Sequence, residues 1–250
     1  MLFARYEAHG EIAYGVVEGN SVRQITTTPF DDYEVIDHVH ALSEVRLLSP
    51  CTPAKIFYLG SNYADHTIDE VLKEPMVYLK MPNAIVGPGD TVMLPREATN
   101  VEQEAELVAV IGRRCKKVSE ADALDCVLGY TCGNDISARD WQERDGRSFW
   151  RAKSSDTFAP IGPYIATDVD DSNTDIVARV NGREVQRINT SDMIFGVAAS
   201  ISYISQTVTL EPGDVLFTGT GGTNAVLHDG DVVEIEIPGI GTLSNPVAVE

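Results

Sequence analysis

Long apolar runs and cysteine are both scarce in this chain, and each scarcity argues against a class of protein. No stretch approaches the roughly 18 consecutive apolar residues that a membrane-spanning helix needs. The N-terminus has no basic stretch followed by an apolar core, so we expect no signal peptide and a cytoplasmic location. The four cysteines in 250 residues form no Cys-x-x-Cys pair, which argues against a structural zinc site or a disulfide framework.

Positive charge is scarce as well. The chain has 19 Lys and Arg residues against 38 Asp and Glu residues, a net charge of −19, and few of the basic residues are lysines. Such a surface repels nucleic acid and anionic membranes, so we expect neither as a partner. An acidic, lysine-poor surface resembles that of proteins adapted to high salt, where screening weakens self-repulsion. An ordinary acidic cytosolic enzyme is the alternative.

Strand patterns dominate what is present. Short runs of β-branched and aromatic residues recur along the chain, and Asn181-Gly182 is a hairpin-turn signal. Residues 119–128 and 192–205 have a helical spacing of apolar side chains. The expected strands are residues 2–6, 12–17, 55–60, 77–80, 104–111, 176–180, 215–218 and 232–237.

Two prolines, Pro50 and Pro53, mark the best candidate for a domain boundary. We therefore predict a small N-terminal β-rich module in residues 1–50 and a larger catalytic domain in residues 51–250. The fold class is mostly β with a few helices (α+β).

An acidic motif carries the sharpest chemistry. Glu102, Glu104 and Glu106 alternate along the chain, and residues two apart in a strand share a face. Five apolar residues follow Glu106, so this strand should enter the core, where a carboxylate needs a partner. Hard cations such as Mg²⁺, Mn²⁺ or Ca²⁺ prefer oxygen ligands. The alternative is a solvated edge strand with acidic side chains, and the Glu-x-Glu pattern alone does not decide between them.

Four further polar segments are candidates for a binding site. Residues 134–142 combine carboxylates with an arginine and a glutamine, and Lys153 stands out in a chain short of lysine. Residues 60–66 and 218–223 read as ligand loops. The second loop lacks the spacing of a phosphate-binding P-loop, so its glycines are expected to bring backbone N–H groups close to a carboxylate.

Taken in order, these segments resemble the fumarylacetoacetate hydrolase family from about Lys55 to the C-terminus. The matching motifs are Gly60-x-Asn62-Tyr63-x-x-His66, Glu104-x-Glu106-Leu107, Asn134-Asp135-x-Ser137-x-Arg139-Asp140-x-Gln142, Lys153-x-x-Asp156-x-x-x-Pro160-x-Gly162-Pro163 and Leu210-x-Pro212-Gly213-Asp214-x-x-x-Thr218-Gly219-Thr220. The resemblance, which extends to acylpyruvases and 2-hydroxyhepta-2,4-diene-1,7-dioate isomerases, implies a mixed β-sandwich or β-roll catalytic domain that forms a homodimer.

The resemblance also implies a metal site. Glu104, Glu106 and Asp135 would hold Mg²⁺, with Mn²⁺ or Ca²⁺ as alternatives, and Glu102 would be a flanking or surface carboxylate. A 2-oxo acid can chelate such a cation through its keto and carboxylate oxygens, and the cation polarises the carbonyl.

Five residues are implied to bind the substrate. They are Arg139, Gln142, Lys153, Gly219 and Thr220. The first three would surround the oxo and carboxylate oxygens, and the last two would clamp the carboxylate. Cleavage or decarboxylation beside the carbonyl leaves an enolate, whose charge Lys153 would also stabilise as a catalytic residue.

A histidine and one of two acidic residues complete the implied catalytic set. His66 resembles the family histidine that activates water, or it would move a proton in an isomerisation. Many hydrolytic members carry glutamate three positions later, where this chain has Asp69 followed by Glu70. Aspartate is one methylene shorter, so either residue could partner His66.

The reaction type stays open at this point. Hydrolysis of a C–C bond in an acylpyruvate-like 2-oxo acid is the first expectation. Isomerisation or decarboxylation of an unsaturated 2-oxo dicarboxylate, dehydration of a 2-keto-3-deoxy sugar acid and oxaloacetate decarboxylation are the alternatives, because fold and metal do not fix the reaction. A non-catalytic binding protein would not need all of the implied metal and catalytic residues, which are Glu104, Glu106, Asp135, Lys153 and His66. Arg144, Arg147, Trp150 and Arg151, between Gln142 and Lys153, either bind a second carboxylate of the substrate or lie on the surface or at a dimer interface.

Overall fold

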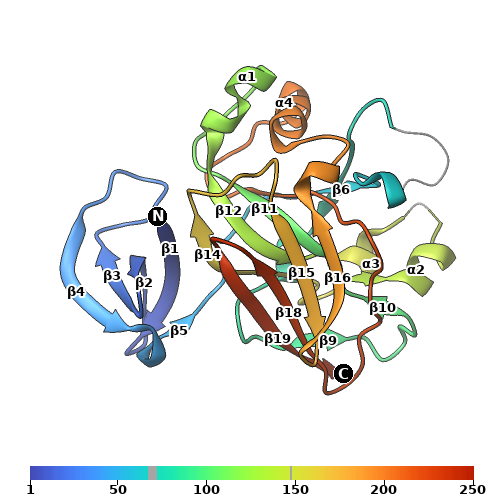
Figure 1. Ribbon diagram of the computed structural model, residues 1–250, viewed down its shortest axis with the longest axis horizontal. Helices are drawn as coiled ribbons and strands as arrows, with labels where there is room; N and C mark the ends of the chain where they lie inside the picture. Colours follow the sequence, from blue (N-terminus) through green and yellow to red (C-terminus); the bar gives the residue numbers. More distant parts are fainter. Residues whose placement is uncertain (67–71, 147) are drawn as a thin grey trace.

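The computed structural model describes residues 1–66, 72–146 and 148–250. Within these ranges the strands form one large mixed sheet, a five-stranded sheet and a two-stranded ribbon, with few helices (Figure 1). The predicted α+β class is confirmed. No helix in the described ranges is long and apolar enough to cross a membrane.

The N-terminal module is an antiparallel meander at one end of the large sheet, drawn in blue in Figure 1. Its strands are β1 (Leu2–Ala8), β2 (Glu11–Glu18), β3 (Ser21–Ile25), β4 (Val35–Ala41) and β5 (Arg46–Leu47). Ala4, Tyr6 and Val22 form a small core of their own, whereas Phe3 and Ile25 belong to the main core. The module joins the rest through β1, where Phe3 lies opposite Ile165.

The large sheet continues through six strands that carry one side of the candidate site. In spatial order they are β14 (Ala159–Ala166), β12 (Val127–Asn134), β11 (Ala105–Ile111), β17 (Val215–Phe217), β6 (Ile56–Gly60) and β7 (Met76–Lys80). Every residue of β11 is buried, because β12 and β17 flank it and a second layer covers it. Strands β17 and β6 run parallel, whereas the other pairs among these six are antiparallel.

The second layer is the five-stranded sheet. It consists of β16 (Arg183–Asn189), β15 (Asp175–Val180), β18 (Val232–Ile237), β19 (Gly241–Val249) and β9 (Val92–Leu94). Alternate residues such as Ile176, Ala178 and Ile235 are buried and belong to the main core, as expected for a sheet with one buried face. The predicted Asn181-Gly182 turn joins β15 to β16 with positive φ at both residues, 53° and 76°.

The helices differ from the sequence prediction. The segment predicted helical over 119–128 is α1 (Glu120–Ala123) followed by a 3₁₀ turn, η4 (Leu124–Cys126), and Val127 already begins β12. The Ser119 hydroxyl donates to the Asp122 carboxylate at 2.5 Å instead of capping the helix. The helix predicted over 192–205 is α4 (Val197–Thr207), because Asn189 caps a separate 3₁₀ turn, η5 (Thr190–Asp192).

Two short helices near the site were not predicted at all. They are α2 (Arg139–Arg144) and α3 (Trp150–Ser154), and at five or six residues each they are too short for a periodic pattern to show. The remaining elements are short: β8 (Ile85–Val86), which pairs with β14, β10 (Val101–Glu102), which pairs with β13 (Ser137–Ala138), and the 3₁₀ turns η1 (Leu42–Glu44), η2 (Ala64–His66) and η3 (Pro82–Ala84).

Candidate metal and substrate site

Two neighbouring strands bring the acidic residues together. In the β11–β12 ladder Glu106 lies opposite Gly133 and Ala105 lies opposite Asn134. Glu104 and Asp135 sit just beyond the paired ends, and the Asp135 N–H donates to the Glu104 carbonyl at 2.9 Å. The predicted strand over 104–111 therefore begins one residue later. The Glu104 N–H donates to the Asn134 side chain at 3.0 Å instead of to a strand partner, which separates β10 from β11.

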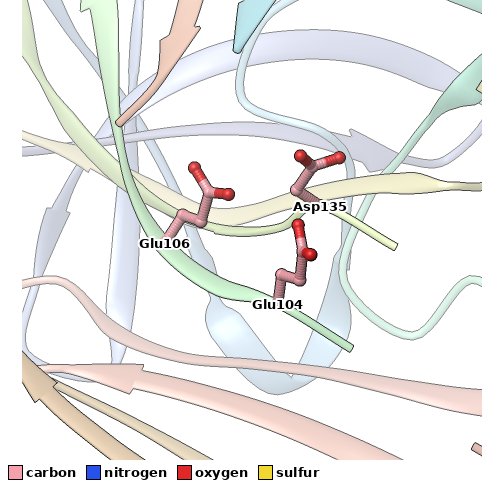
Figure 2. A group of neighbouring side chains, drawn as sticks. All are labelled: Glu104, Glu106 and Asp135. Atoms are coloured by element: carbon pink, nitrogen blue, oxygen red, sulfur yellow. The ribbon is translucent and has the colours of Figure 1, made fainter. Parts of the chain in front are cut away.

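The three carboxylates form one buried cluster. Glu104, Glu106 and Asp135 each offer an oxygen within 4.8 Å of the others, and Figure 2 shows the side chains converging from β11 and the end of β12. Glu106 is 1% exposed and accepts a hydrogen bond from the Gly219 N–H at 2.6 Å. Burial, followed by the charges of Asp135 and Glu104, raises the pKa of Glu106 well above its ordinary value. A cluster with this excess of buried negative charge fits a hard divalent cation.

Positive side chains balance part of this charge. The Lys153 ammonium donates to Glu104 and to Asp135, at 2.6 Å each. Arg139 bridges Glu104 and Glu102, with 2.8 Å between its Nε and the Glu102 carboxylate. Burial opposes ionisation of Glu104, but Lys153 and Arg139 outweigh it and lower the pKa of Glu104 to about 2. Glu104 therefore stays ionised at neutral pH, and Glu102 is its neighbour across Arg139.

The two unpredicted helices carry three of the residues expected to bind substrate. Arg139 and Gln142 lie three residues apart on α2, where side chains are neighbours, and the Arg139 guanidinium donates to the Gln142 amide oxygen at 3.0 Å. Lys153 lies on α3 and is 5% exposed. The structure brings Arg139, Gln142 and Lys153 together on the rim of the carboxylate cluster.

The glycine-rich loop after β17 forms another wall. Gly219 has a φ of +90°, and a Cβ there would lie 2.9 Å from the Asn62 Cβ, so glycine is needed to bring this N–H to Glu106. The Thr220 hydroxyl donates to the Ala105 carbonyl at 2.9 Å and accepts from the Gln186 amide at 2.8 Å. The loop presents one backbone N–H to the Glu106 carboxylate, and its binding of a substrate carboxylate stays a prediction.

The histidine and its acidic partners are described only in part. His66 ends the 3₁₀ turn η2, and the structure describes its backbone but not its side chain. Asp69, Glu70 and Arg147 lie outside the described residues. The neighbouring Asp65 accepts a hydrogen bond from the Gly222 N–H at 2.6 Å, which ties η2 to the glycine-rich loop.

Two arginines of the basic segment between Gln142 and Lys153 contact Asp145 in the described part of the chain. Arg151 pairs with Asp145, and its guanidinium lies 4.8 Å from the centre of the Trp141 ring. Arg144 approaches the same carboxylate at 3.6 Å and is 55% exposed. Arg144 and Arg151 therefore share Asp145 as a partner, and whether they bind a second substrate carboxylate stays a prediction.

Sequence reasoning missed three polar residues that build the site. Lys80 is buried and forms an ion pair with Asp135. Gln186, on β16, links the Ala105 N–H to Thr220 and to the Gly221 carbonyl. Asn62 lies in the Gly60-x-Asn62-Tyr63 motif but was not predicted to bind metal or substrate. Its side chain bridges the Thr218 carbonyl, at 2.7 Å, and the main chain of Phe195. The scarcity of lysine was the one signal that pointed to Lys80.

Comparison with known proteins identifies the family. Residues 55–248 match the family model described as "Fumarylacetoacetate (FAA) hydrolase C-terminal", and residues 1–50 match one described as "Rv2993c-like, N-terminal". The chain belongs to the fumarylacetoacetate hydrolase family. Among curated relatives, the mitochondrial oxaloacetate tautomerase of Xenopus laevis is 43% identical over 92% of this chain and 76% of its own length. This chain is therefore an enzyme of that family.

Solved structures of related proteins match the fold of this chain over its full length. A 5-carboxymethyl-2-hydroxymuconate delta-isomerase from Mycobacterium smegmatis matches with a TM-score of 0.94 and 40% identity over the whole of both chains. A 2-hydroxyhepta-2,4-diene-1,7-dioate isomerase from Mycobacterium marinum matches with a TM-score of 0.94 and 42% identity, over 100% of this chain and 99% of that one. A maleylpyruvate hydrolase from Sphingobium sp. SYK-6, in complex with manganese(II) and pyruvate, is 29% identical with a TM-score of 0.83, over 100% and 99% of the two chains.

Proposed function

We propose that this enzyme uses a divalent cation to catalyse proton transfer at the carbon beside the carbonyl of a small 2-oxo acid, interconverting keto and enol forms or moving a double bond. The observation that carries the proposal is the buried cluster of Glu104, Glu106 and Asp135, with Lys153 donating to two of them. Both the substrate and its enolate are anions with adjacent oxygens, which suit a cation beside an ammonium group.

The charge of the cluster supports an anionic substrate. Seven ionisable groups form the cluster, and with every group ionised its four carboxylates and three cations give a net charge of −1: Glu102, Glu104, Glu106, Asp135, Lys80, Lys153 and Arg139. A bound divalent cation changes this to +1, which attracts a carboxylate and stabilises the additional negative charge of an enolate. Without the cation the same cluster offers a 2-oxo acid no net positive charge.

Each remaining residue has a role that follows from its position. Glu104, Glu106 and Asp135 would hold the cation, which when bound polarises the substrate carbonyl. Lys153 would donate a hydrogen bond to the enolate oxygen, and Arg139 with Gln142 would orient the carboxylate. Gly219, whose N–H donates to Glu106, and Thr220, whose hydroxyl donates to the Ala105 carbonyl, would line the other side of the substrate. His66 would remove or return the proton on carbon.

The names of the relatives favour proton transfer over C–C cleavage. Proteins at 40 to 43% identity are named a tautomerase and two isomerases, and these reactions only move a proton or a double bond. Hydrolysis of an acylpyruvate-like substrate, our first expectation from the sequence, is the second candidate. The maleylpyruvate hydrolase with manganese and pyruvate supports it, and hydrolysis additionally requires His66, with Asp69 or Glu70, to activate water.

Several expectations stay predictions. The choice of Mg²⁺ over Mn²⁺ or Ca²⁺, the homodimer, the cytoplasmic location and the adaptation to salt are among them. Decarboxylation and sugar-acid dehydration have no observation in their favour beyond the shared scaffold.

The test is a substrate panel with metal-stripped and metal-loaded enzyme. The panel contains enol oxaloacetate, a 2-hydroxy-2,4-dienedioate and acetylpyruvate. The first two reactions are followed by the loss of enol or diene absorbance, and cleavage of acetylpyruvate is followed by the release of acetate. We expect Mg²⁺- or Mn²⁺-dependent loss of the enol or diene signal above that of the metal alone. Glu106→Gln should abolish it, and Glu97→Gln, which changes an exposed carboxylate that is not part of the cluster, should not. Acetate release alone would replace tautomerisation by hydrolysis, and equal rates with and without metal would refute both.

A further inference from the structure

Lys80 is a buried charged residue at the edge of the large sheet, and the proposed reaction assigns it no role. It is the last residue of β7, the strand at the end of the sheet opposite the N-terminal module. Its neighbours Leu79 and Met81 are 61% and 51% exposed, whereas the Lys80 side chain is 0% exposed. Because side chains alternate along a strand, the position between two exposed residues points inward.

The ammonium group of Lys80 connects three segments of the site. It forms an ion pair with the Asp135 carboxylate, on the oxygen opposite the one that Lys153 contacts. It also lies 2.5 Å from the Lys153 carbonyl, 3.0 Å from the Phe158 carbonyl and 3.4 Å from the Ile136 carbonyl. These oxygens belong to the segment after β12, to α3 and to the segment before β14.

Stability alone is a weak reason for this arrangement. An ammonium group without solvent contact loses its hydration, and replacing a buried ion pair by apolar side chains is often neutral or stabilising. What the ion pair adds is geometry. It fixes the orientation of one carboxylate in the cluster, and through the Lys153 carbonyl it fixes the helix that carries the substrate-binding ammonium.

We infer that Lys80 is a positioning residue, which holds Asp135 and the main chain of Lys153 in the arrangement that the divalent cation and the substrate require. The inference rests on the proposed function, because it assumes that Asp135 binds the cation. Lys80 acts through Asp135 and α3 and does not itself touch the reacting atoms.

Two roles for Lys80 predict opposite effects on metal binding. A lysine that acts only through its charge repels a divalent cation nearby, so its removal should tighten metal binding. A lysine that positions a ligand has the reverse effect, and loss of such an outer contact typically weakens metal affinity by about 10- to 100-fold. The sign of the change therefore separates the two.

The experiment measures Mn²⁺ affinity by calorimetry for wild type, Lys80→Met and Lys55→Met. Lys55→Met is the matched control because it removes another lysine from a buried carboxylate, Asp214, at 2.7 Å and outside the cluster. We expect Lys80→Met to weaken Mn²⁺ binding at least tenfold and to lower kcat, with Mn²⁺ affinity in Lys55→Met within twofold of wild type. If Lys80→Met does not fold, Lys80→Arg keeps the charge and should show a smaller loss of affinity in the same direction.

The possible results distinguish failure of the positioning role of Lys80 from failure of the proposed function. Unchanged or tighter Mn²⁺ binding in a folded Lys80 variant, with wild type binding normally, overturns the positioning role alone. Failure of wild type to bind Mn²⁺ overturns the proposed function and the positioning role with it. Loss of folding in both Lys80 variants, with Lys55→Met folded, overturns the positioning role in favour of a purely structural one.

Discussion

Replacing Glu106 by Gln keeps the size of the side chain and an oxygen for the Gly219 N–H. It removes a carboxyl group that, without metal, must either repel its ionised neighbours or hold a proton. Two unit charges within 4.8 Å repel each other by about 3 kcal/mol or more at an effective dielectric of about 20. Glu106 faces two such neighbours, and Lys153 offsets part of the repulsion. We therefore expect metal-free Glu106→Gln to be about 2 kcal/mol more stable than wild type, with a Tm higher by about 4–8 °C.

The cation should reverse this order. At a concentration of 100 times its Kd, a ligand stabilises wild type by about 2.7 kcal/mol. If the variant loses about 100-fold in affinity with its ligand oxygen, the same concentration stabilises it by only about 0.4 kcal/mol. Wild type should therefore be the less stable protein in a chelator and the more stable one in saturating Mn²⁺.

Thermal unfolding in chelator and in Mn²⁺ measures both changes on one protein pair. Glu97→Gln controls for the loss of an acidic group from a strongly acidic chain, and its metal-dependent shift should equal that of wild type. A metal-free Glu106→Gln protein less stable than wild type, or one that keeps the full metal-dependent shift, would refute the reasoning about repulsion and ligation.

Three further predictions concern the walls of the site and its protons. Gly219→Ala places a methyl group 2.9 Å from the Asn62 Cβ, at a residue whose φ is +90°. We therefore expect kcat to fall at least about tenfold and the Tm to drop, and unchanged kinetics would contradict the need for glycine next to Asn62. Gln186→Leu removes the Gln186 amide from the Ala105 N–H, the Thr220 hydroxyl and the Gly221 carbonyl, so chemical denaturation should show a loss of about 2–3 kcal/mol in the free energy of unfolding. A neutral variant would show that water replaces the amide. Burial and neighbouring carboxylates raise the pKa of Glu106, so the cation displaces a proton and the apparent Mn²⁺ affinity should rise with pH. Calorimetry in buffers of different ionisation enthalpy would detect the released proton. A pH-independent Mn²⁺ affinity would contradict this proton release.

Local pattern was enough to predict eight of the nineteen strands in the described part of the chain. Runs of β-branched and aromatic residues lie within two residues of β1, β2, β6, β7, β11, β15, β17 and β18, because these residue types favour strands whether one face or both faces are buried. The helices were less predictable. Asn189 ends one segment in a 3₁₀ turn, and α2 and α3 are each shorter than two full turns, so neither leaves a periodic signal.

The candidate site shows where sequence reasoning stops. Glu104 and Glu106 could be found from their spacing, but Asp135 joins them only through the pairing of β11 with β12, and it entered through the family resemblance. Lys80 and Gln186 reach the cluster from β7 and β16, and no local rule predicts contacts across such separations in sequence. The three carboxylates do lie together as predicted, and their role as metal ligands stays a prediction.

The most direct test of the central claim is exchange of the hydrogens at the carbon beside the carbonyl of a 2-oxo acid in D₂O, followed by proton NMR. Metal-loaded wild type should exchange these hydrogens faster than Mg²⁺ alone. Metal-stripped enzyme and Glu106→Gln with Mg²⁺ should match the blank, because the enolate then lacks its counter-charge. Exchange that persists in the metal-stripped enzyme or in Glu106→Gln would contradict a metal-dependent enolisation at this carboxylate cluster.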